Sequence, residues 1–387
     1  ERACTGANPL ARLPAALYAW KVDEHTIRVL EFEKVLALLA DEAAFSIGRE
    51  LAMAVRPETE YDRAFELQAQ SAEMRALDQM GIDVPFSGAH DIRGAIRAAG
   101  IGQLLEPGDL VESAQTLRTA WSAHRVIEKL RDRAPQLALI ADEISDFRRF
   151  TDEVDRAITP RGEVADNASE QLGTTRRELR LAESRLEQRA HAALADAIRR
   201  GVAQEGLLTE RNGRKVIPIK ADYRGQVQGI VHDVSSSGAT VFIEPMGVVD
   251  AGNQVRELQL AEQREVRRVL QRLSAILGDM EAEALRSTMA LARLDVITAK
   301  IRLGRRMKAG LPPPGEVAPW FKDGGATVIK RGRHPLLRGE VVPTTIEVGG
   351  EYAGVLITGP NTGGKTVALK TLGLLTLMAQ AGIPIPC

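Results

Sequence analysis

The chain has 387 residues, a formal net charge of −1 and an aromatic content of 4%. This length suggests two to three domains with ample material for a core. The near-neutral charge excludes a general attraction to nucleic acid or membranes, so any basic surface has to be local. Because Cys4 and Cys387 lie at opposite ends, a disulfide framework is excluded and a reducing cytoplasm is expected. No apolar run approaches the ~18 residues of a membrane span.

Residues 1–22 are predicted to be a leader or extension rather than a signal peptide, because Pro9 and Pro14 interrupt their apolar stretch. From Asp23 onward the apolar residues recur at helical spacing, so residues 23–160 are predicted to form a helical core. Glycines and prolines divide this core into segments. The predicted helices span residues 46–55, 61–80, 92–99, 107–130 and 137–144.

Two long helices are predicted within residues 161–206 and 248–310. In the first, Leu172 and Leu179 begin a heptad repeat in a highly charged stretch. In the second, apolar residues between 255 and 280 keep a three-to-four spacing. We expect the first helix to ascend and the second to descend beside it, as an antiparallel coiled-coil lever that a return helix follows.

Between the two long helices, residues 207–247 change to a period of two, which predicts short strands at 216–219, 227–231 and 239–243. These strands are expected to form a small antiparallel β clamp at the tip of the lever. The clamp is either a soluble surface hairpin or a tip that contacts phosphates, where each cation adds salt-sensitive affinity. The candidate nucleic-acid-binding residues are Arg211, Arg214, Lys215, Lys220 and Arg224.

Residues 311–387 are predicted to form a linker and then the start of a P-loop α/β domain. Strands are expected at 327–330 and 345–348, and the apolar run 354–358 is expected to be a buried strand. Residues 359–366 then fit the pattern G-x-x-x-x-G-K-[ST] and lead into an apolar helix. The helix is expected to end near Gly382 and Pro384.

This strand, glycine loop and helix together predict a phosphate cradle. Backbone N–H groups and the helix dipole would bind the phosphates, Lys365 would reach the β/γ-phosphates, and the Thr366 hydroxyl would bind Mg²⁺. The six histidines show no ligand spacing, so no further metal site is predicted. The candidate nucleotide-binding residues are Gly359, Pro360, Asn361, Thr362, Gly363, Gly364, Lys365 and Thr366.

This order of parts resembles the MutS family of DNA-binding ATPases. Residues 290–296 resemble the helix before the family's ATPase domain, residues 332–337 its Arg-His-Pro turn, and residues 358–366 its P-loop, where Pro-Asn follows the first glycine. The resemblance implies ATP and Mg²⁺ as cofactors, DNA as a partner and a homodimer whose levers close around it.

A closer resemblance is to the bacterial MutS paralogue that lacks the mismatch-reading domain and carries a C-terminal Smr nuclease domain. Its hallmarks are similar to residues 216–220 and 229–245, and the likeness extends roughly from residue 23 to residue 385. Mismatch-repair MutS has a Phe-x-Glu wedge. Here Phe-x-Glu occurs at residues 242–244, where Phe242 is expected to face inward at a strand end, so direct mismatch reading is not expected.

The sequence stops about one helix after the P-loop, before the acidic strand that completes the Mg²⁺ site in this family and before the Smr domain. We therefore expect residues 1–387 to bind ATP weakly without turnover, and the segment after about Gly315 to be loosely folded.

Three functions remain open from the sequence. The first is an ATP-dependent protein that binds branched or recombining DNA and restrains recombination. The second is a quality-control factor that binds collided ribosomes, and the third is a coiled-coil scaffold with a vestigial nucleotide loop. The basic tip fits both of the first two, since phosphate contacts carry no information about the partner.

Overall fold

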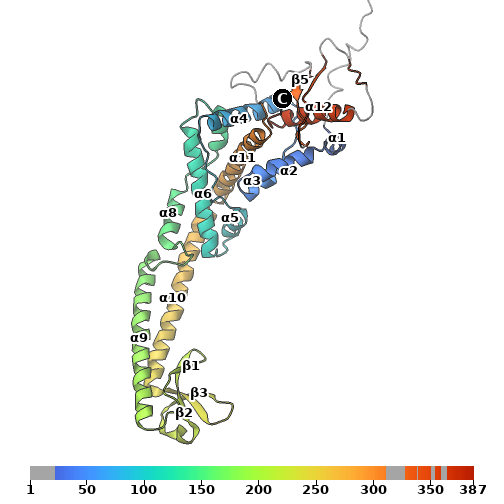
Figure 1. Ribbon diagram of the computed structural model, residues 1–387. Helices are drawn as coiled ribbons and strands as arrows, with labels where there is room; N and C mark the ends of the chain where they lie inside the picture. The colour runs from blue at the N-terminus through green and yellow to red at the C-terminus, as the bar shows by residue number, and fades with distance from the viewer. Residues whose placement is uncertain (1–21, 311–326, 338, 350–353, 359–363) are drawn as a thin grey trace, which may run out of the picture. The chain divides into compact units, whose positions relative to one another are not determined.

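The computed structural model of the chain describes residues 22–310, 327–337, 339–349, 354–358 and 364–387. Within these residues the chain is mainly helical and has a small antiparallel sheet, which confirms the predicted fold class at this level. The chain forms two compact units, both of which are drawn in Figure 1. The first unit takes in Glu1–Ile96, Glu112–Arg148 and Met280–Cys387, and the second Arg97–Val111 and Arg149–Asp279.

The helices predicted between residues 46 and 144 are all present, with ends that differ by a few residues from those expected. Their order follows the breaks that glycine and proline introduce. The helices up to residue 157 are α1 (Glu24–Val29), α2 (Phe32–Glu42), α3 (Ser46–Ala54), α4 (Tyr61–Gln79), α5 (Arg93–Gly100), α6 (Pro107–Glu128), α7 (Pro135–Ala141) and α8 (Arg148–Ala157).

The first unit is built around α11 (Glu281–Arg306), which is buried on more than one side. Leu291 and Leu294 belong to an apolar cluster with α4 and α7, while Val296 and Leu303 belong to a second cluster with α2. A helix that is apolar around most of its circumference has to be central. The buried Asp295 carboxylate accepts hydrogen bonds from the N–H groups of Ala44 and Phe45, which fixes the segment that leads into α3.

The second unit contains two long helices that lie side by side, α9 (Glu170–Arg199) and α10 (Met246–Asp279) (Figure 1). They are antiparallel, because Arg272 near the end of α10 reaches the Ala168 carbonyl before α9 begins, while Arg176 reaches Glu262. Small side chains in α9, such as Ala182, are buried against α10. The antiparallel pair is therefore present, and its designation as a coiled coil stays a prediction.

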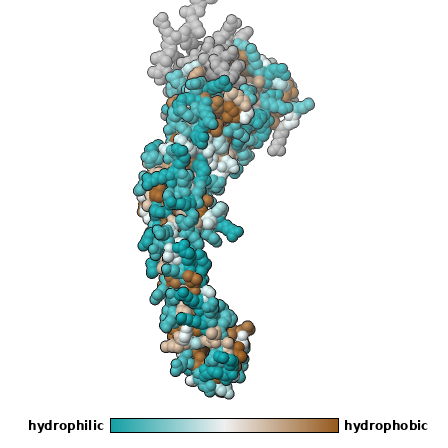
Figure 2. Space-filling view, turned by 90° about the vertical axis from the view of Figure 1, so that its left-hand side faces the viewer, coloured by the Kyte–Doolittle hydropathy of each residue, from teal (hydrophilic) through white to brown (hydrophobic). Residues whose placement is uncertain are grey.

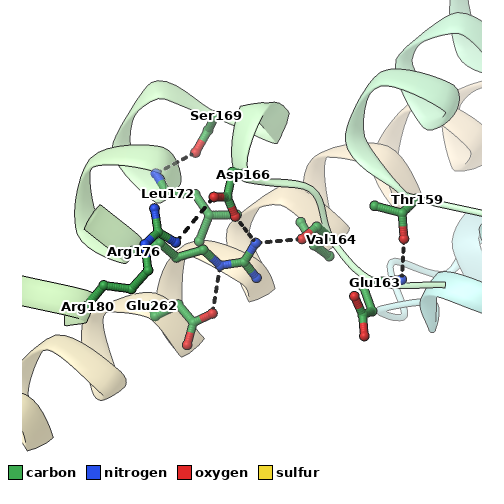
Figure 3. A network of polar contacts seen from close by, with 9 residues as sticks. All are labelled: Thr159, Glu163, Val164, Asp166, Ser169, Leu172, Arg176, Arg180 and Glu262. Carbon is green, nitrogen blue, oxygen red and sulfur yellow. Dashed lines mark hydrogen bonds and ion pairs between the residues drawn. The ribbon is translucent and has the colours of Figure 1, made fainter. Parts of the chain in front are cut away.

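Arg176 connects the start of α9 to its surroundings (Figure 3). Its guanidinium donates to Glu262 of α10 at 2.8 Å, to the Val164 carbonyl at 2.8 Å and to Asp166 at 2.7 Å. The hydrogen bond from Arg176 holds the pKa of Asp166 below its usual value. One planar side chain with several donors thus links both helices and the segment that precedes them.

The clamp, residues 207–247, is an antiparallel sheet with the strand order β1-β2-β4-β3. Asn212 (φ 52°) and Gly213 (φ 73°) form the tight turn between its first two strands, since type I′ turns need positive φ at both positions. Apolar side chains of the two central strands, such as Ile217 and Ile243, pack against Leu194 near the end of α9. The strands are β1 (Thr209–Arg211), β2 (Arg214–Lys220), β3 (Gly229–Val234) and β4 (Thr240–Pro245).

Helix α10 begins at Met246, although the pattern predicted its start near Val255. The stretch between Met246 and Val255 contains glycines at 247 and 252. Gly252 in fact allows close packing, since a Cβ there would lie 2.8 Å from the Arg214 guanidinium and 3.1 Å from the Glu244 carboxylate. The absence of a side chain is what lets the helix approach the sheet.

The segment after the predicted linker contains β5 (Thr327–Gly332), β6 (Thr344–Val348) and α12 (Lys365–Gln380). The expectation of loose folding after about Gly315 is wrong for the described residues. Leu374, Leu375 and Met378 of α12 are fully buried in the cluster that contains α2. Their apolar periodicity is enough to fix the helix against the first unit.

Helix α12 ends at Gln380, close to the predicted end, and Gly382 follows the C-cap residue with a φ of 67°. The Ile383 N–H donates to the Met378 carbonyl and the Gly382 N–H to the Ala379 carbonyl, the pattern of a Schellman motif. A Cβ on Gly382 would lie 2.7 Å from the Leu67 carbonyl oxygen of α4.

We predict that Gly382→Ala lowers the free energy of unfolding by roughly 3 kcal/mol, from the left-handed backbone and the contact with α4 together. Gly81 is a matched control, since it ends α4 in the same way with φ 70° and open space around it. Gly81→Ala should cost only about 1 kcal/mol. Urea unfolding measures both, and equal losses would contradict the close contact.

Candidate functional site

The helix that follows the glycine motif begins at its lysine. Gly364 has a φ of 82° and precedes α12, Lys365 is the first helical residue, and the Thr366 side chain is exposed. The N-cap residue, Gly364, has no side chain to cap this helix start, and the first N–H groups of a helix point away from its body. The other predicted nucleotide-binding residues lie outside the described residues: Gly359, Pro360, Asn361, Thr362 and Gly363.

The predicted buried strand before the motif is not present. Residues 354–358 have no regular structure, and Val355 is 49% and Leu356 88% exposed. A strand needs a hydrogen-bonded neighbour, and β5 and β6 pair with each other. The apolar, β-branched composition of residues 354–358 therefore predicted a strand, but among the described residues no other strand pairs with this run.

A groove of about 1170 Å³ lies beside the Arg-His-Pro turn, between α2, the end of α11 and the segment after β5. His334 of this turn is buried, which lowers the pKa of its imidazole. The groove could not be predicted from the sequence, because its walls come from three distant segments. Its charged lining residues are Glu31, Lys34, Arg306, Lys308, Arg333 and Glu340.

Glu31 connects this groove to α12. Its carboxylate pairs with Lys34 and lies 3.3 Å from the Lys370 ammonium, and these hydrogen bonds, that of Lys34 first, hold the pKa of Glu31 below its usual value. Lys370 lies five residues after Lys365, roughly 8 Å along the helix axis. The groove and the start of α12 are therefore near neighbours in the first unit.

Four of the five cations predicted at the clamp have partners within the second unit. The Arg211 guanidinium lies 4.4 Å from the centroid of the Phe242 ring and its Nε 3.3 Å from Asp233. Lys220 donates to the Gly201 carbonyl at 3.1 Å.

Lys215 lies 3.6 Å from Glu187 of α9 and 3.7 Å from Glu210. The fold thus brings to the clamp carboxylates that are distant in sequence. A count of the charges in the neighbouring sequence did not include them. Arg224 differs from the other four, because in the described part of the chain no hydrogen bond or ion pair is found for it.

The remaining cation, Arg214, is part of a buried polar cluster. Glu244 is 1% exposed and lies between two partners, Arg214 at 3.4 Å and His232 Nε2 at 2.7 Å. Arg214 also donates to the Asn253 side chain of α10 at 2.7 Å. Since a buried carboxylate needs such partners, Arg214 holds the sheet to α10.

Phe242 does not face inward as predicted. Val241 and Ile243 point into the clamp core, so the alternation of the strand places Phe242 on the opposite face, beneath Arg211. Figure 2 shows hydrophobic residues on the surface at this end of the second unit. The large apolar side chains exposed on the clamp include Leu207, Tyr223, Ile230, Val234 and Met246.

None of the described helices is long and apolar enough to cross a membrane. In the same residues, no group of three or more His, Cys, Asp or Glu side chains is arranged to hold a metal ion.

Known proteins resemble this chain over most of its length, although no family model matches it. It is 40% identical to the endonuclease MutS2 of Symbiobacterium thermophilum over 370 residues, and 39% identical to that of Pelotomaculum thermopropionicum over 365 residues. Each alignment covers 94% of this chain and 45% or 46% of the relative. The chain therefore spans somewhat less than half the length of the relatives it matches.

We predict that Arg214→Ala destabilises the clamp by about 2 kcal/mol, because it leaves the buried Glu244 carboxylate with one partner fewer. Arg224→Ala, which removes the same side chain from an exposed position, should change stability by less than about 0.5 kcal/mol. Hydrogen exchange of the amides in β2 and β4 measures the difference. Similar exchange in both variants would show that Arg214 does not stabilise the sheet.

Proposed function

We propose that this chain, 94% of which aligns with an endonuclease MutS2 at 40% identity, is the nucleotide- and nucleic-acid-binding part of a MutS-like ATPase that acts on branched or recombining DNA. The observation that carries the proposal is the start of α12. A glycine with positive φ, an uncapped helix start, a lysine and a threonine follow one another in the order that a phosphate-binding loop requires.

In this proposal, different described residues bind the phosphates of ATP and the Mg²⁺ ion. The N–H groups after Gly364 and the α12 dipole bind phosphate oxygens, Lys365 neutralises their charge, and Thr366 provides a hydroxyl for Mg²⁺. Bound ATP supplies the phosphoryl group and the binding energy. The groove beside Glu31 and Lys370 supports the proposal, because it leaves space close to the same helix.

The clamp is the proposed nucleic-acid contact. Its strongest candidate is Arg224, which has no described partner, rather than Arg214, which is held by Glu244. Phosphate contacts of this kind give affinity without sequence specificity. A homodimer, restraint of recombination and the endonuclease activity in the relatives' names belong to the proposal for the longer protein.

Binding to four-way DNA junctions tests the proposal against the ribosomal alternative. The chain should bind a labelled junction more tightly than a linear duplex of the same length, and an ATP analogue should change that affinity. Co-sedimentation with ribosomes, without preference for junctions, would replace this proposal by the quality-control function.

We predict that Lys365→Ala weakens the binding of a fluorescent ATP analogue by about 30-fold, the loss of a charged hydrogen bond worth roughly 2 kcal/mol. The fold should be intact, because this side chain lies outside the apolar clusters. Lys129→Ala, at an exposed lysine of the same unit, should bind as the wild type does. Unchanged affinity in Lys365→Ala would refute the proposed site.

We predict that Arg224→Gln weakens binding to all DNA sequences alike and reduces the slope of log K against log salt by about 0.9, the value for one lost duplex phosphate contact. Arg125→Gln, at an exposed arginine of the first unit, should leave the slope unchanged. Fluorescence anisotropy between low and moderate salt measures both slopes. An unaltered slope for Arg224→Gln would exclude this part of the clamp as the contact.

A further inference from the structure

The C-terminal end of α12 lies inside the first unit, where its last carbonyl groups have no further helical turn to bind them. Two side chains of α4 supply donors. Gln68 Nε2 donates to the Ala379 carbonyl at 2.5 Å, and the Ser71 hydroxyl donates to the Gly382 carbonyl at 2.6 Å. Both side chains are almost completely buried, so water cannot replace them.

Lys300 of α11 supplies a third donor. Its ammonium group donates to the Ala381 carbonyl at 2.7 Å, and the side chain is 3% exposed. The Glu58 N–H, in the segment before α4, donates to the Gln380 carbonyl at 3.3 Å. The four consecutive carbonyls of residues 379–382, at the end of α12 and directly after it, are therefore each bound by a different residue outside that helix.

Lys300 is the unusual member of this set. Burial lowers the pKa of its ammonium to about 8, so the group is still mostly protonated at neutral pH. A buried charge is costly, and an apolar side chain of similar length would fill the space without that cost. What the ammonium adds is a charge-assisted hydrogen bond at the negative end of a helix dipole, which a methionine cannot provide.

A helix transmits displacement along its axis because its hydrogen bonds resist stretching and bending. With 16 residues, α12 is about 24 Å long. Its start carries Lys365 and Thr366, and its end is held by α4 and α11. Movement at the start of α12 therefore reaches two other helices of the same unit if the contacts at its end persist.

We propose that Lys300 is the positioning residue that makes α12 move as one body with α4 and α11, so that nucleotide binding at the start of α12 is transmitted to those two helices. This inference rests on the proposed function, since the nucleotide is the proposed cause of the movement. The proposed role of Lys300 is to transmit the effect of nucleotide binding and not to bind the nucleotide, because its ammonium lies at the opposite end of α12 from Lys365.

Hydrogen exchange of the whole chain, with and without a non-hydrolysable ATP analogue, tests the inference. In the wild type the analogue should slow exchange at the start of α12 and also in α4 and α11. Lys300→Met should bind the analogue within about twofold of the wild type, but the protection of α4 and α11 should fall by at least about fivefold. Lys129→Met makes the same change at an exposed lysine and should behave as the wild type does.

Lys300→Gln provides a milder variant in case Lys300→Met does not fold, because it removes the charge-assisted hydrogen bond to the Ala381 carbonyl and keeps a polar side chain. Transmission that is unchanged in whichever of the two Lys300 variants folds would refute the role of this contact while leaving the nucleotide site intact. A loss of analogue affinity in step with the loss of protection would also refute it, since Lys300 would then act on binding. If the wild type binds no analogue, the proposed function fails, and the inference fails with it.

Discussion

A helix that ends inside a protein has to find donors for its last carbonyl groups, because little water reaches them there. In the first unit this requirement is met by Gln68, Ser71 and Lys300 side chains and by one backbone N–H. The arrangement of α4, α11 and α12 depends on it. Helices packed by apolar contacts alone can slide in small steps, whereas directional hydrogen bonds to consecutive carbonyls select one register.

The second unit uses a buried carboxylate for a comparable purpose. Glu244 lies under α10 with Arg214 and His232 as partners, and Gly252 provides the space. From the sequence, Arg214 had been interpreted as a cation for phosphates, whereas Gly252 had been given no role. The buried cluster gives both residues a structural reason that does not involve a ligand.

The sequence predicted the parts of the fold that depend on local pattern. The helices of the first unit, the turn at Asn212 and Gly213 and the end of α12 at Gly382 follow from periodicity and from backbone preferences of single residues. The start of α10 and the state of residues 354–358 depend instead on what lies next to them in space. Pattern alone contains no information about such neighbours.

The same limit applies to the candidate site. The motif ending in Lys365 and Thr366 was visible because its residues are contiguous. The groove beside Glu31 and the donors around Lys300 come from segments hundreds of residues apart, so no local signal could have indicated them. The number of unpaired cations at the clamp was overestimated for the same reason, because Glu187 and Glu244 come close to these cations only in the folded chain.

The link between Arg214 and Asn253 has a practical consequence for dividing the chain into modules. By strand assignment the clamp ends at Pro245, and a chimaera that joined its sheet to other helices would be cut there. Such a cut would separate Arg214 from the α10 residue it binds and would remove Gly252 from above the buried Glu244. The transferable piece is therefore the sheet together with the first three turns of α10.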